Sequence, residues 1–484
     1  MNIIDPILAQ CRFQPDAPAL CAPGEPHATI AYGQLGKLIN NVARHTERLG
    51  LRRGDTVVLY VQDMIGHAVL ILGLAKAGVI TISGRGPELP AEIKVDAVVA
   101  DIEGGLPSGK RVIHADASLM AGDGAALTAM RGAPGGDEVC RIVFTSGTTG
   151  EPKGVAFTHR MVASRIARFD YLAGNALPAN LRCCVDLGLS TSLGYYYLIY
   201  GLTRGGLVVL PGASQGNAMN ACDFHDVRYW IGAPGGLAAL LAFYEESKGR
   251  RCNFHGMLAG GSLLLKPLSE RVRARMCASL ISAYGSTETH MVATAPSHLT
   301  AEVPGAVGYL TPGMIAEAVD ATHRPLPPGG DGLIRIFGPY NVKAYIGASG
   351  ETAAAFRDGW FYPGDIGSVT RDNMLIITGR EKTVMNIGGD KVSPEMIEST
   401  LMAFPGVDRA GVLSVVNDVG IEEIWAALAS REGVNEAQLR ALCQGLLPPA
   451  FMPRRFIRID EIPTNEMGKV DRRQLADRLH PRKH

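Results

Sequence analysis

The 484-residue chain lacks an excess of charge of either sign, because lysine plus arginine and aspartate plus glutamate each number 47. This balance gives no bulk electrostatic argument for nucleic acid or an anionic membrane surface as a partner. The nine cysteines form no C-x-x-C pair and no cluster with histidine, which argues against a disulfide framework and a zinc site. We therefore predict a cytoplasmic protein with reduced thiols and no nucleic-acid partner.

The chain also has little that resembles a targeting segment or a membrane anchor. Its N-terminus lacks the basic and then apolar pattern of a signal peptide. The apolar stretch "MIGHAVLILGLAKAGVITI" is interrupted by His67, Lys76 and glycines, so it is a poor transmembrane candidate. We predict a buried helix followed by a strand there, and no integral membrane association.

Strand-like runs at 57–62, 78–82 and 96–101 alternate with a helix near 64–77. Such alternation is typical of parallel β-α-β units. Further on, "RPLPPGGDG" (324–332) reads as a turn ahead of a strand within a β-rich section. The sequence predicts an α/β fold whose large N-terminal domain combines β-α-β subdomains with a β-rich subdomain.

The chain is longer than a single core usually is, so more than one domain is predicted. The pattern of the sequence changes after "LIITGR" (375–380), where we predict that a smaller domain begins. The next helix has Ser393 as its N-cap and Pro394 at its first position. Two strand-like runs, a helix near 435–447 and the strand "FIRID" complete an α+β unit. We place the domains at 1–379 and 383–484, with a hinge at 380–382.

The stretch "TSGTTGEPKG" (145–154) resembles a phosphate-binding loop but departs from the Walker pattern. Counting from Gly147, Pro152 replaces the second glycine, and a glycine replaces the hydroxyl residue after Lys153. The runs "CRIVF" and "GVAF" indicate that the loop joins two strands and that Thr158 caps a later helix. A Walker loop leads directly into its helix. The amides, hydroxyls and lysine can still wrap a polyphosphate; the alternative is a flexible hairpin loop.

Four further stretches carry residues suited to chemistry. They are "AYGSTET" (283–289), "DGWFYPGD" (358–365), "GREKTVMNIGGDKVSPEMIE" (379–398) and "PTNEMGKVDR" (463–472). Taken singly, Tyr284 could be a core side chain, Asp365 a turn former and Lys469 a solvated surface charge. In this order and spacing, the five motifs resemble the acyl-adenylate-forming superfamily of acyl-CoA synthetases, peptide-synthetase adenylation domains and firefly luciferase. The resemblance covers nearly the whole chain and is closest in type to an acyl-CoA synthetase.

This resemblance implies a large N-terminal domain and a small, mobile C-terminal domain that rotates between two half-reactions. In the first, a carboxylate attacks the α-phosphate of ATP to give acyl-AMP and pyrophosphate. In the second, a thiol attacks the acyl-AMP. The implied cofactors are ATP, Mg²⁺ and either CoA or the phosphopantetheine of a carrier protein, and the implied substrate is a small carboxylic acid.

The resemblance also implies which residues bind the nucleotide. The pyrophosphate would be gripped by Thr145, Ser146, Gly147, Thr148, Thr149, Gly150 and Lys153. The adenine slot would be lined by Ser282, Ala283, Tyr284 and Gly285, and the ribose hydroxyls would be bound by Asp365 and Arg380.

Catalytic roles are implied in the same way. Thr287 and Glu288 would stand near the α-phosphate, with Glu288 as a magnesium ligand. Lys469 would contact the carboxylate and the α-phosphate and stabilise the charge of the transition state. Lys382 would be the hinge residue. The wall past which a pantetheine thiol enters would be formed by Gly388 and Gly389.

The identity of the acid is predicted to depend on 186–201, on 259–265 and on the surroundings of His290. The candidate acid-binding residues are Ser190, Ser192, Tyr195, Gly260, Gly261 and His290. Amino-acid-activating relatives carry an amine-binding aspartate at a position close to Ser192, which argues against an amino acid. The segment has no second charge, so a neutral-tailed monocarboxylic acid is favoured. Alternatives stay open for two of these residues. A protonated His290 could pair with an acidic tail, or the ring could merely pack under the adenine loop. Tyr195 could line the pocket or only pack within its helix.

Three functions are consistent with these motifs. The favoured one is an AMP-forming acyl-CoA ligase, an acid–thiol ligase. The second is a stand-alone adenylation enzyme that loads an acyl or aminoacyl group onto a carrier protein in trans. The third is a non-catalytic nucleotide-binding or interaction protein, which the presence of Lys469, Glu288 and Asp365 disfavours.

Overall fold

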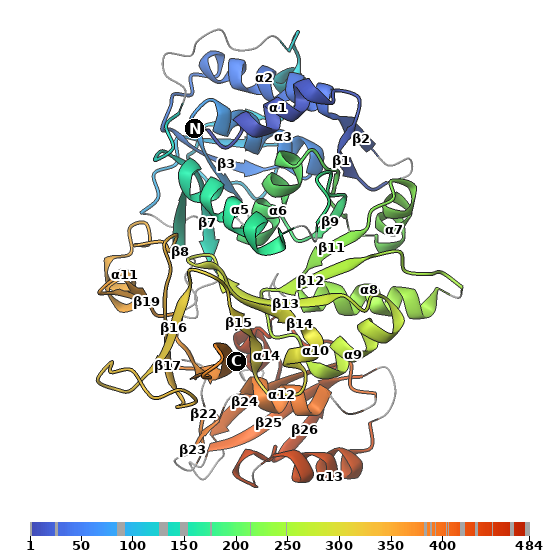
Figure 1. Ribbon diagram of the computed structural model, residues 1–484, viewed down its shortest axis with the longest axis vertical. Helices are drawn as coiled ribbons and strands as arrows, with labels where there is room; N and C mark the ends of the chain where they lie inside the picture. The colour runs from blue at the N-terminus through green and yellow to red at the C-terminus, as the bar shows by residue number, and fades with distance from the viewer. Residues whose placement is uncertain are drawn as a thin grey trace.

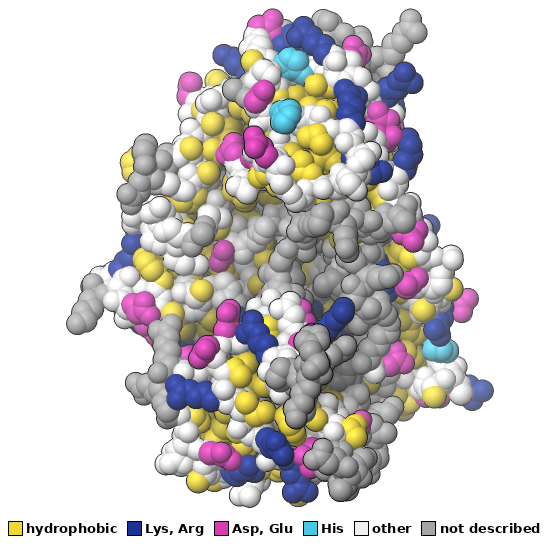
Figure 2. Space-filling view, turned by 180° about the vertical axis from the view of Figure 1, so that it is seen from behind, with side chains coloured by type: hydrophobic (Ala, Val, Ile, Leu, Met, Phe, Trp, Pro, Cys, Tyr) yellow, Lys and Arg dark blue, Asp and Glu magenta, His cyan; other side chains and the backbone are white. Residues whose placement is uncertain are grey.

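The computed structural model describes most of the chain. The described residues are 2–24, 28–84, 92–124, 134–145, 153–174, 177–212, 214–247, 249–381, 385–387, 390–392, 394–402, 404, 406–416, 422–430, 434–447, 449–464 and 469–479. The N-terminal elements lie at one end of the molecule and the C-terminal elements at the other (Figure 1). Acidic and basic side chains are interspersed over the face in Figure 2, in keeping with the zero net charge. None of the helices in the described ranges has the length and apolar character needed to span a bilayer.

The first sheet has the strand order β6-β5-β3-β4-β7-β8. Its strands are β3 (Thr56–Tyr60), β4 (Ile80–Ser83), β5 (Ala97–Ala100), β6 (Val112–His114), β7 (Val139–Thr145) and β8 (Lys153–Thr158). All pairs are parallel except β7 with β8. The predicted buried helix is confirmed as α3 (Met64–Lys76), which Asp63 caps and which joins β3 to β4. Helices α1 (Asp5–Phe13), α2 (Tyr32–Arg48), α4 (Ala117–Met120) and α5 (His159–Ala173) complete this region.

A longer sheet follows the order β18-β19-β17-β20-β21-β15-β14-β13-β12-β11-β9-β10-β1-β2, with β16 beside β17. Its strands are β1 (Pro18–Ala22), β2 (Ala28–Ala31), β9 (Cys183–Asp186), β10 (Val208–Val209), β11 (Tyr229–Gly232), β12 (Gly256–Gly260), β13 (Leu280–Ser286), β14 (His290–Pro296), β15 (Ala306–Leu310), β16 (Ile315–Val319), β17 (Gly332–Phe337), β18 (Phe356–Arg357), β19 (Trp360–Phe361), β20 (Asp365–Val369) and β21 (Met374–Arg380).

The pairing of this long sheet changes at β13. From β1 through β10, β9, β11 and β12 to β13 the neighbours are parallel, and from β14 onward they are antiparallel. Its helices are α6 (Ser192–Thr203), α7 (Gln215–Phe224), α8 (Pro234–Glu246), α9 (Lys266–Arg275), α10 (Ser297–Thr300) and α11 (Ser349–Ala355). Ligands of open α/β sheets bind beyond the carboxyl ends of parallel strands, and the end of β13 is such a place.

The C-terminal region forms a separate α+β unit with the strand order β24-β25-β26. Its elements are β22 (Met385–Ile387), β23 (Asp390–Val392), α12 (Pro394–Met402), β24 (Arg409–Val416), β25 (Glu422–Ala429), α13 (Glu436–Leu446), β26 (Arg455–Arg458) and α14 (Arg472–Leu479). Buried Ile397, Leu401, Val412 and Leu439 belong to a core of its own. The predicted fold class is therefore confirmed. The boundaries at 379 and 383 stay a prediction, and the hinge residue Lys382 lies outside the described residues.

Candidate active site

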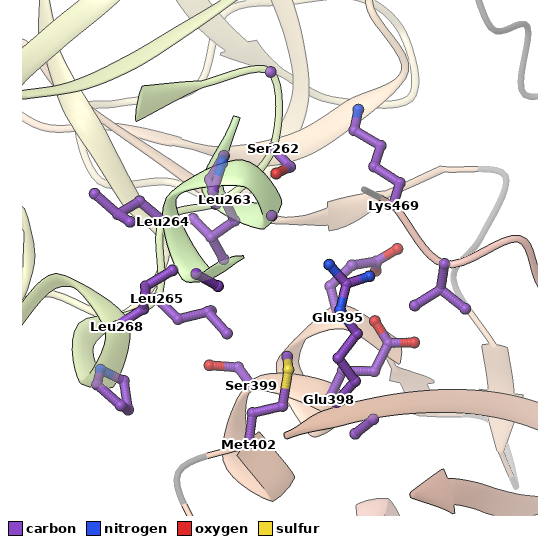
Figure 3. A pocket seen from close by; sticks show the side chains of 18 of the residues that line it. Ser262, Leu263, Leu264, Leu265, Leu268, Glu395, Glu398, Ser399, Met402 and Lys469 are labelled. Atoms are coloured by element: carbon purple, nitrogen blue, oxygen red, sulfur yellow. The ribbon is translucent and has the colours of Figure 1, made fainter. Parts of the chain in front are cut away.

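A cleft of about 2150 Å³ lies between the long sheet and the C-terminal unit. Its lining brings together residues that are far apart in the sequence. Those predicted to bind the nucleotide, the acid or the transition state are Thr145, Gly261, Ser282, Ala283, Tyr284, Gly285, Asp365, Arg380 and Lys469. Figure 3 shows a part of this cleft, with Leu263, Leu264, Leu265 and Leu268 in one part of the lining and Ser399 and Met402 of α12 in another. Of the predicted nucleotide-binding residues that the structure describes, all but Lys153 therefore line one cavity.

The carboxylate of Asp365 is held at both oxygens. In the antiparallel register of β20 and β21, Asp365 stands opposite Arg380, and the two form an ion pair with 2.8 Å between Arg380 Nε and Asp365 Oδ1. The Tyr284 hydroxyl donates to Oδ2. Burial, and then the Asp365 charge, raise the pKa of Tyr284 far above its ordinary value, which keeps the hydroxyl a donor. Because a carboxylate has about four acceptor sites, the fixed oxygens can still accept ribose hydroxyls.

The turn between β13 and β14 carries Thr287 and Glu288. A side chain at Gly285 is excluded, since its Cβ would lie 1.8 Å from the His290 carbonyl oxygen. His290 itself has a φ of 61°, so the hairpin turns sharply at this point. The tight hairpin holds the adjoining backbone at the cleft wall, where adenine was predicted to lie.

Glu288 is buried, with 5% of its surface exposed. The Tyr345 hydroxyl donates to its Oε1 at 2.6 Å, and Arg165 Nη2 donates to its backbone carbonyl at 2.7 Å. Within the described ranges, no group of three or more histidine, cysteine, aspartate or glutamate side chains is placed to hold a metal ion. Mg²⁺ is commonly bound by one or two carboxylates plus substrate phosphates and water. A single fixed carboxylate beside the predicted phosphate-binding residues would fit that ion.

The predicted phosphate loop joins two strands, as expected. Thr145 and Lys153 face each other across the antiparallel pair β7–β8. The later helix is capped by Thr158, which accepts from the Met161 amide at 3.1 Å. The Lys153 ammonium lies 5.1 Å from the centre of the Tyr345 ring. Outside the described residues lie Ser146, Gly147, Thr148, Thr149, Gly150, Gly388 and Gly389.

Lys469 enters the cleft from the C-terminal unit. In Figure 3 its side chain extends away from Glu395 and Glu398 on α12. Burial and the nearby Arg380 lower the pKa of Lys469 to about 8, against the opposing effect of Asp365, Glu395 and Glu288. Lys469 lines the same cavity as Asp365 and Arg380. Its location fits contact with a phosphate better than a solvated surface position.

The residues predicted to contact the acid are more dispersed. Tyr195 belongs to α6, is 1% exposed and packs into the core, where the Arg141 guanidinium lies 4.9 Å from the centre of the Tyr195 ring. Ser190 and Ser192 are half-buried at the start of α6, and Gly260 lies against Ala283 of β13. The roles of these residues stay predictions.

His290 is buried, and its ring centre lies 4.6 Å from that of Tyr196. Burial, and then the charges of Arg165 and Arg168, hold the pKa of His290 well below its ordinary value. The imidazole is therefore neutral at physiological pH. A neutral ring cannot pair electrostatically with an acidic tail, so the packing alternative for His290 gains support.

Three buried residues of this region were missed by the sequence reasoning. Arg165 is 1% exposed and also donates to the Thr287 carbonyl at 3.1 Å. Arg141 is fully buried and donates to the Leu189 carbonyl and to the Ser83 hydroxyl. A charge inside the apolar run "CRIVF" was the available signal for Arg141. Tyr345, in "KAYIG", gives no such signal, because a tyrosine in an apolar run reads as ordinary core.

Comparison with known proteins follows the same order along the chain. The model of the AMP-binding enzyme family matches residues 7–346, and that of the AMP-binding enzyme C-terminal domain matches 396–469. The chain is 28% identical to 2-succinylbenzoate–CoA ligase of Geobacillus kaustophilus, covering 96% of each chain. It is 25% identical to 4-chlorobenzoate–CoA ligase of an Arthrobacter species, covering 96% of this chain and 93% of that one.

A third relative has a different acceptor in its name. The chain is 27% identical to a fatty acid–[acyl-carrier-protein] ligase of Streptomyces coeruleorubidus, over 97% of this chain and 94% of the relative. Among solved structures, o-succinylbenzoate coenzyme A synthetase from Bacillus subtilis, in complex with ATP and a magnesium ion, shares the fold. Its TM-score is 0.83, with 23% identity over 98% of this chain and 99% of that one. Since the family model covers more than half of the chain, this protein belongs to the AMP-binding enzyme family, which confirms the resemblance found in its motifs.

Proposed function

We propose that the protein is an AMP-forming acid–thiol ligase, which converts a carboxylic acid and ATP into acyl-AMP and pyrophosphate and then transfers the acyl group to CoA. The observation that carries this proposal is the convergence of the Asp365–Tyr284–Arg380 cluster and Lys469 on one cleft. A fixed carboxylate suits ribose hydroxyls, and a neighbouring ammonium suits a phosphate. Membership of the AMP-binding enzyme family supports the same assignment.

In the adenylation step, a carboxylate oxygen of the substrate forms a bond to the α-phosphorus, and the bond from that phosphorus to the bridging oxygen of pyrophosphate breaks. Asp365 holds the ribose, so the α-phosphate is presented at a defined place in the cleft. Lys469 donates to the oxygens on which charge develops. Glu288 would hold Mg²⁺, which when bound would supply charge that offsets that of the triphosphate. Lys153 and the loop 145–150 hold the leaving pyrophosphate.

In the thioesterification step, a thiolate attacks the acyl carbon and AMP leaves with the electron pair of the anhydride bond. The proposal assigns this step to a second arrangement of the C-terminal unit, reached by rotation at Lys382, with Gly388 and Gly389 beside the entering thiol. The sequence motif supports these three roles. Because Lys469 belongs to the rotating unit, its contact with the phosphate would be confined to the first step.

The acid is proposed to have a neutral tail. The segment Leu189–Tyr197 contributes no cation, and Arg141 and Arg165 beneath it already donate to backbone carbonyls and hydroxyls. His290 is neutral at physiological pH because its pKa is lowered. Burying a second carboxylate here without a cation is unfavourable. The relatives differ on this point, since 4-chlorobenzoate has an uncharged tail and 2-succinylbenzoate has a second carboxylate.

The alternative acceptor is the phosphopantetheine of a carrier protein. The presence of a fatty acid–[acyl-carrier-protein] ligase among the relatives supports this alternative acceptor. Both acceptors present the same thiol, so the cleft residues named above serve either reaction. The two differ in what must be recognised outside the cleft, a nucleotide for CoA and a protein surface for a carrier.

The test supplies preformed acyl-AMP with either CoA or a holo-carrier protein and measures the thioester. We expect thioester formation with CoA at a rate that exceeds the rate with the carrier, together with release of AMP. Thioester formation with the carrier only would select the alternative. Release of ADP in the complete reaction, in place of AMP and pyrophosphate, would refute the adenylation mechanism.

A further inference from the structure

The segment 342–346 connects the two elements that are proposed to act on the phosphates, the turn with Glu288 and the strand with Lys153. At one end, the Val342 amide donates to the Glu288 carbonyl at 2.9 Å. At the other end, the Ile346 amide donates to the Gly154 carbonyl at 2.9 Å, next to Lys153. This connecting segment therefore fixes the distance between the turn that carries Glu288 and the strand that carries Lys153.

Tyr345 lies within the connecting segment and contacts both functional side chains. Its hydroxyl donates to Glu288 Oε1 at 2.6 Å, and its ring lies 5.1 Å from the Lys153 ammonium. The ring is itself held by an edge contact with Phe356, at 5.2 Å between centres. Its backbone amide donates to the Thr352 hydroxyl at 3.0 Å. A tyrosine held at its backbone and its ring has little freedom to release the carboxylate.

Resting on the proposed function, we propose that Tyr345 is a positioning residue that orients the Glu288 carboxylate toward the magnesium ion and holds Lys153 beside the pyrophosphate. The hydroxyl occupies one oxygen of Glu288 and leaves the other for the cation. The ring face attracts the Lys153 ammonium through its quadrupole. One side chain thus fixes the position of the cation site relative to the site of the leaving pyrophosphate.

The two contacts can be separated by substitution. Tyr345→Phe removes the hydroxyl and keeps the ring, whereas Tyr345→Leu removes both. We expect Tyr345→Phe to raise the magnesium concentration for half-maximal pyrophosphate exchange about tenfold, the scale of one hydrogen bond to a buried charge. Tyr345→Leu should weaken pyrophosphate binding further, by about threefold, because the cation–π contact is also lost.

A second measurement does not depend on turnover. It determines the affinity for Mn²⁺ in the presence of ATP and without acid, and it monitors the paramagnetic signal of the free ion. Tyr345→Phe should weaken this binding by about the same tenfold factor. Tyr345→Phe in a Glu288→Gln background should add no loss, because the two residues act on the same ion. The matched control is Tyr32→Phe, which loses buried hydrogen bonds to the Leu202 and Gly206 carbonyls. It should lower the unfolding temperature and leave Mn²⁺ binding unchanged.

The outcomes separate this inference from the function on which it rests. Weaker Mn²⁺ binding in Glu288→Gln but unchanged binding in Tyr345→Phe would overturn the role of Tyr345 alone. Additive losses in the double variant would do the same. Mn²⁺ readings as expected, with no acid supporting exchange in the unaltered protein, would overturn the ligase function and leave the positioning role standing.

Discussion

The nucleotide side and the acid side of the cleft use their charged groups in different ways. On the nucleotide side, Asp365, Arg380 and Lys469 line the cavity. On the acid side, Arg141 and Arg165 are fully or almost fully buried and donate to protein carbonyls and hydroxyls. Charges of the first kind can act on a ligand, while those of the second fix the loop and the turn around it. The difference teaches that residue types in the sequence are enough to predict the reaction, whereas the choice of acid is expected to depend on packing that only the structure shows.

The largest expected effect is on the nucleotide side, at Lys469. Lys469→Ala should slow adenylation by about 10²–10³-fold, the scale of losing one preorganised contact with the transition state. Thioester formation from supplied acyl-AMP should be spared, because the proposal confines Lys469 to the first step. Single-turnover kinetics of the two half-reactions check this. Equal losses in both would remove Lys469 from its assigned role.

Asp365→Asn is expected to have the next largest effect. The neutral amide loses the ion pair with Arg380 and accepts more weakly from the ribose hydroxyls that Asp365 is proposed to bind, so the KM for ATP should rise about 10–100-fold. The KM for the acid should change little. Asp320→Asn, at an exposed turn, is the control and should leave both constants unaltered. A similar rise in both constants for Asp365→Asn would indicate a general structural defect.

The pH dependence of adenylation should report Lys469. Because its pKa is lowered to about 8, the ammonium is present below that pH and is lost as the pH rises through it. We expect kcat/KM for ATP to fall about tenfold per pH unit above pH 8. Lys469→Arg should move this decline upward, since a guanidinium stays charged. A decline that persists unchanged in the arginine variant would assign it to another group.

A smaller effect is expected on the acid side. Arg141→Met should lower the free energy of unfolding by about 2 kcal/mol, because the Leu189 carbonyl loses a buried donor. It should also raise the KM for the acid a few-fold while the KM for ATP stays constant, as the loop before α6 loosens. Arg160→Met, which breaks an exposed pair with Asp137, is the control and should change neither by a measurable amount. If Arg141→Met had the same Tm and the same KM for the acid as the unaltered protein, Arg141 would not stabilise the loop before α6.

The features that could be predicted from the sequence are those set by local patterns, whereas contacts between distant residues could not be predicted. Local patterns predict the strands on both sides of the loop, the cap at Thr158 and an α+β unit in the C-terminal region, and the structure confirms these elements. The hydrogen bond from Tyr284 to Asp365 joins β13 to β20, which are not neighbours in the sheet, and its two residues lie 81 positions apart in the sequence, so no local pattern predicts it. Tyr345 escaped notice because its importance comes from a hydrogen bond to a residue 57 positions away.

The most direct test of the account is exchange of labelled pyrophosphate into ATP, measured without any thiol across monocarboxylates, aryl acids, malonate-type acids and amino acids. The account predicts exchange that requires both Mg²⁺ and an acid, with the highest kcat/KM for an acid whose tail is neutral. A preference for a malonate-type acid or an amino acid would contradict the acid assignment. The absence of exchange with every acid, in a protein that binds ATP, would contradict the central claim that this cleft forms acyl-adenylates.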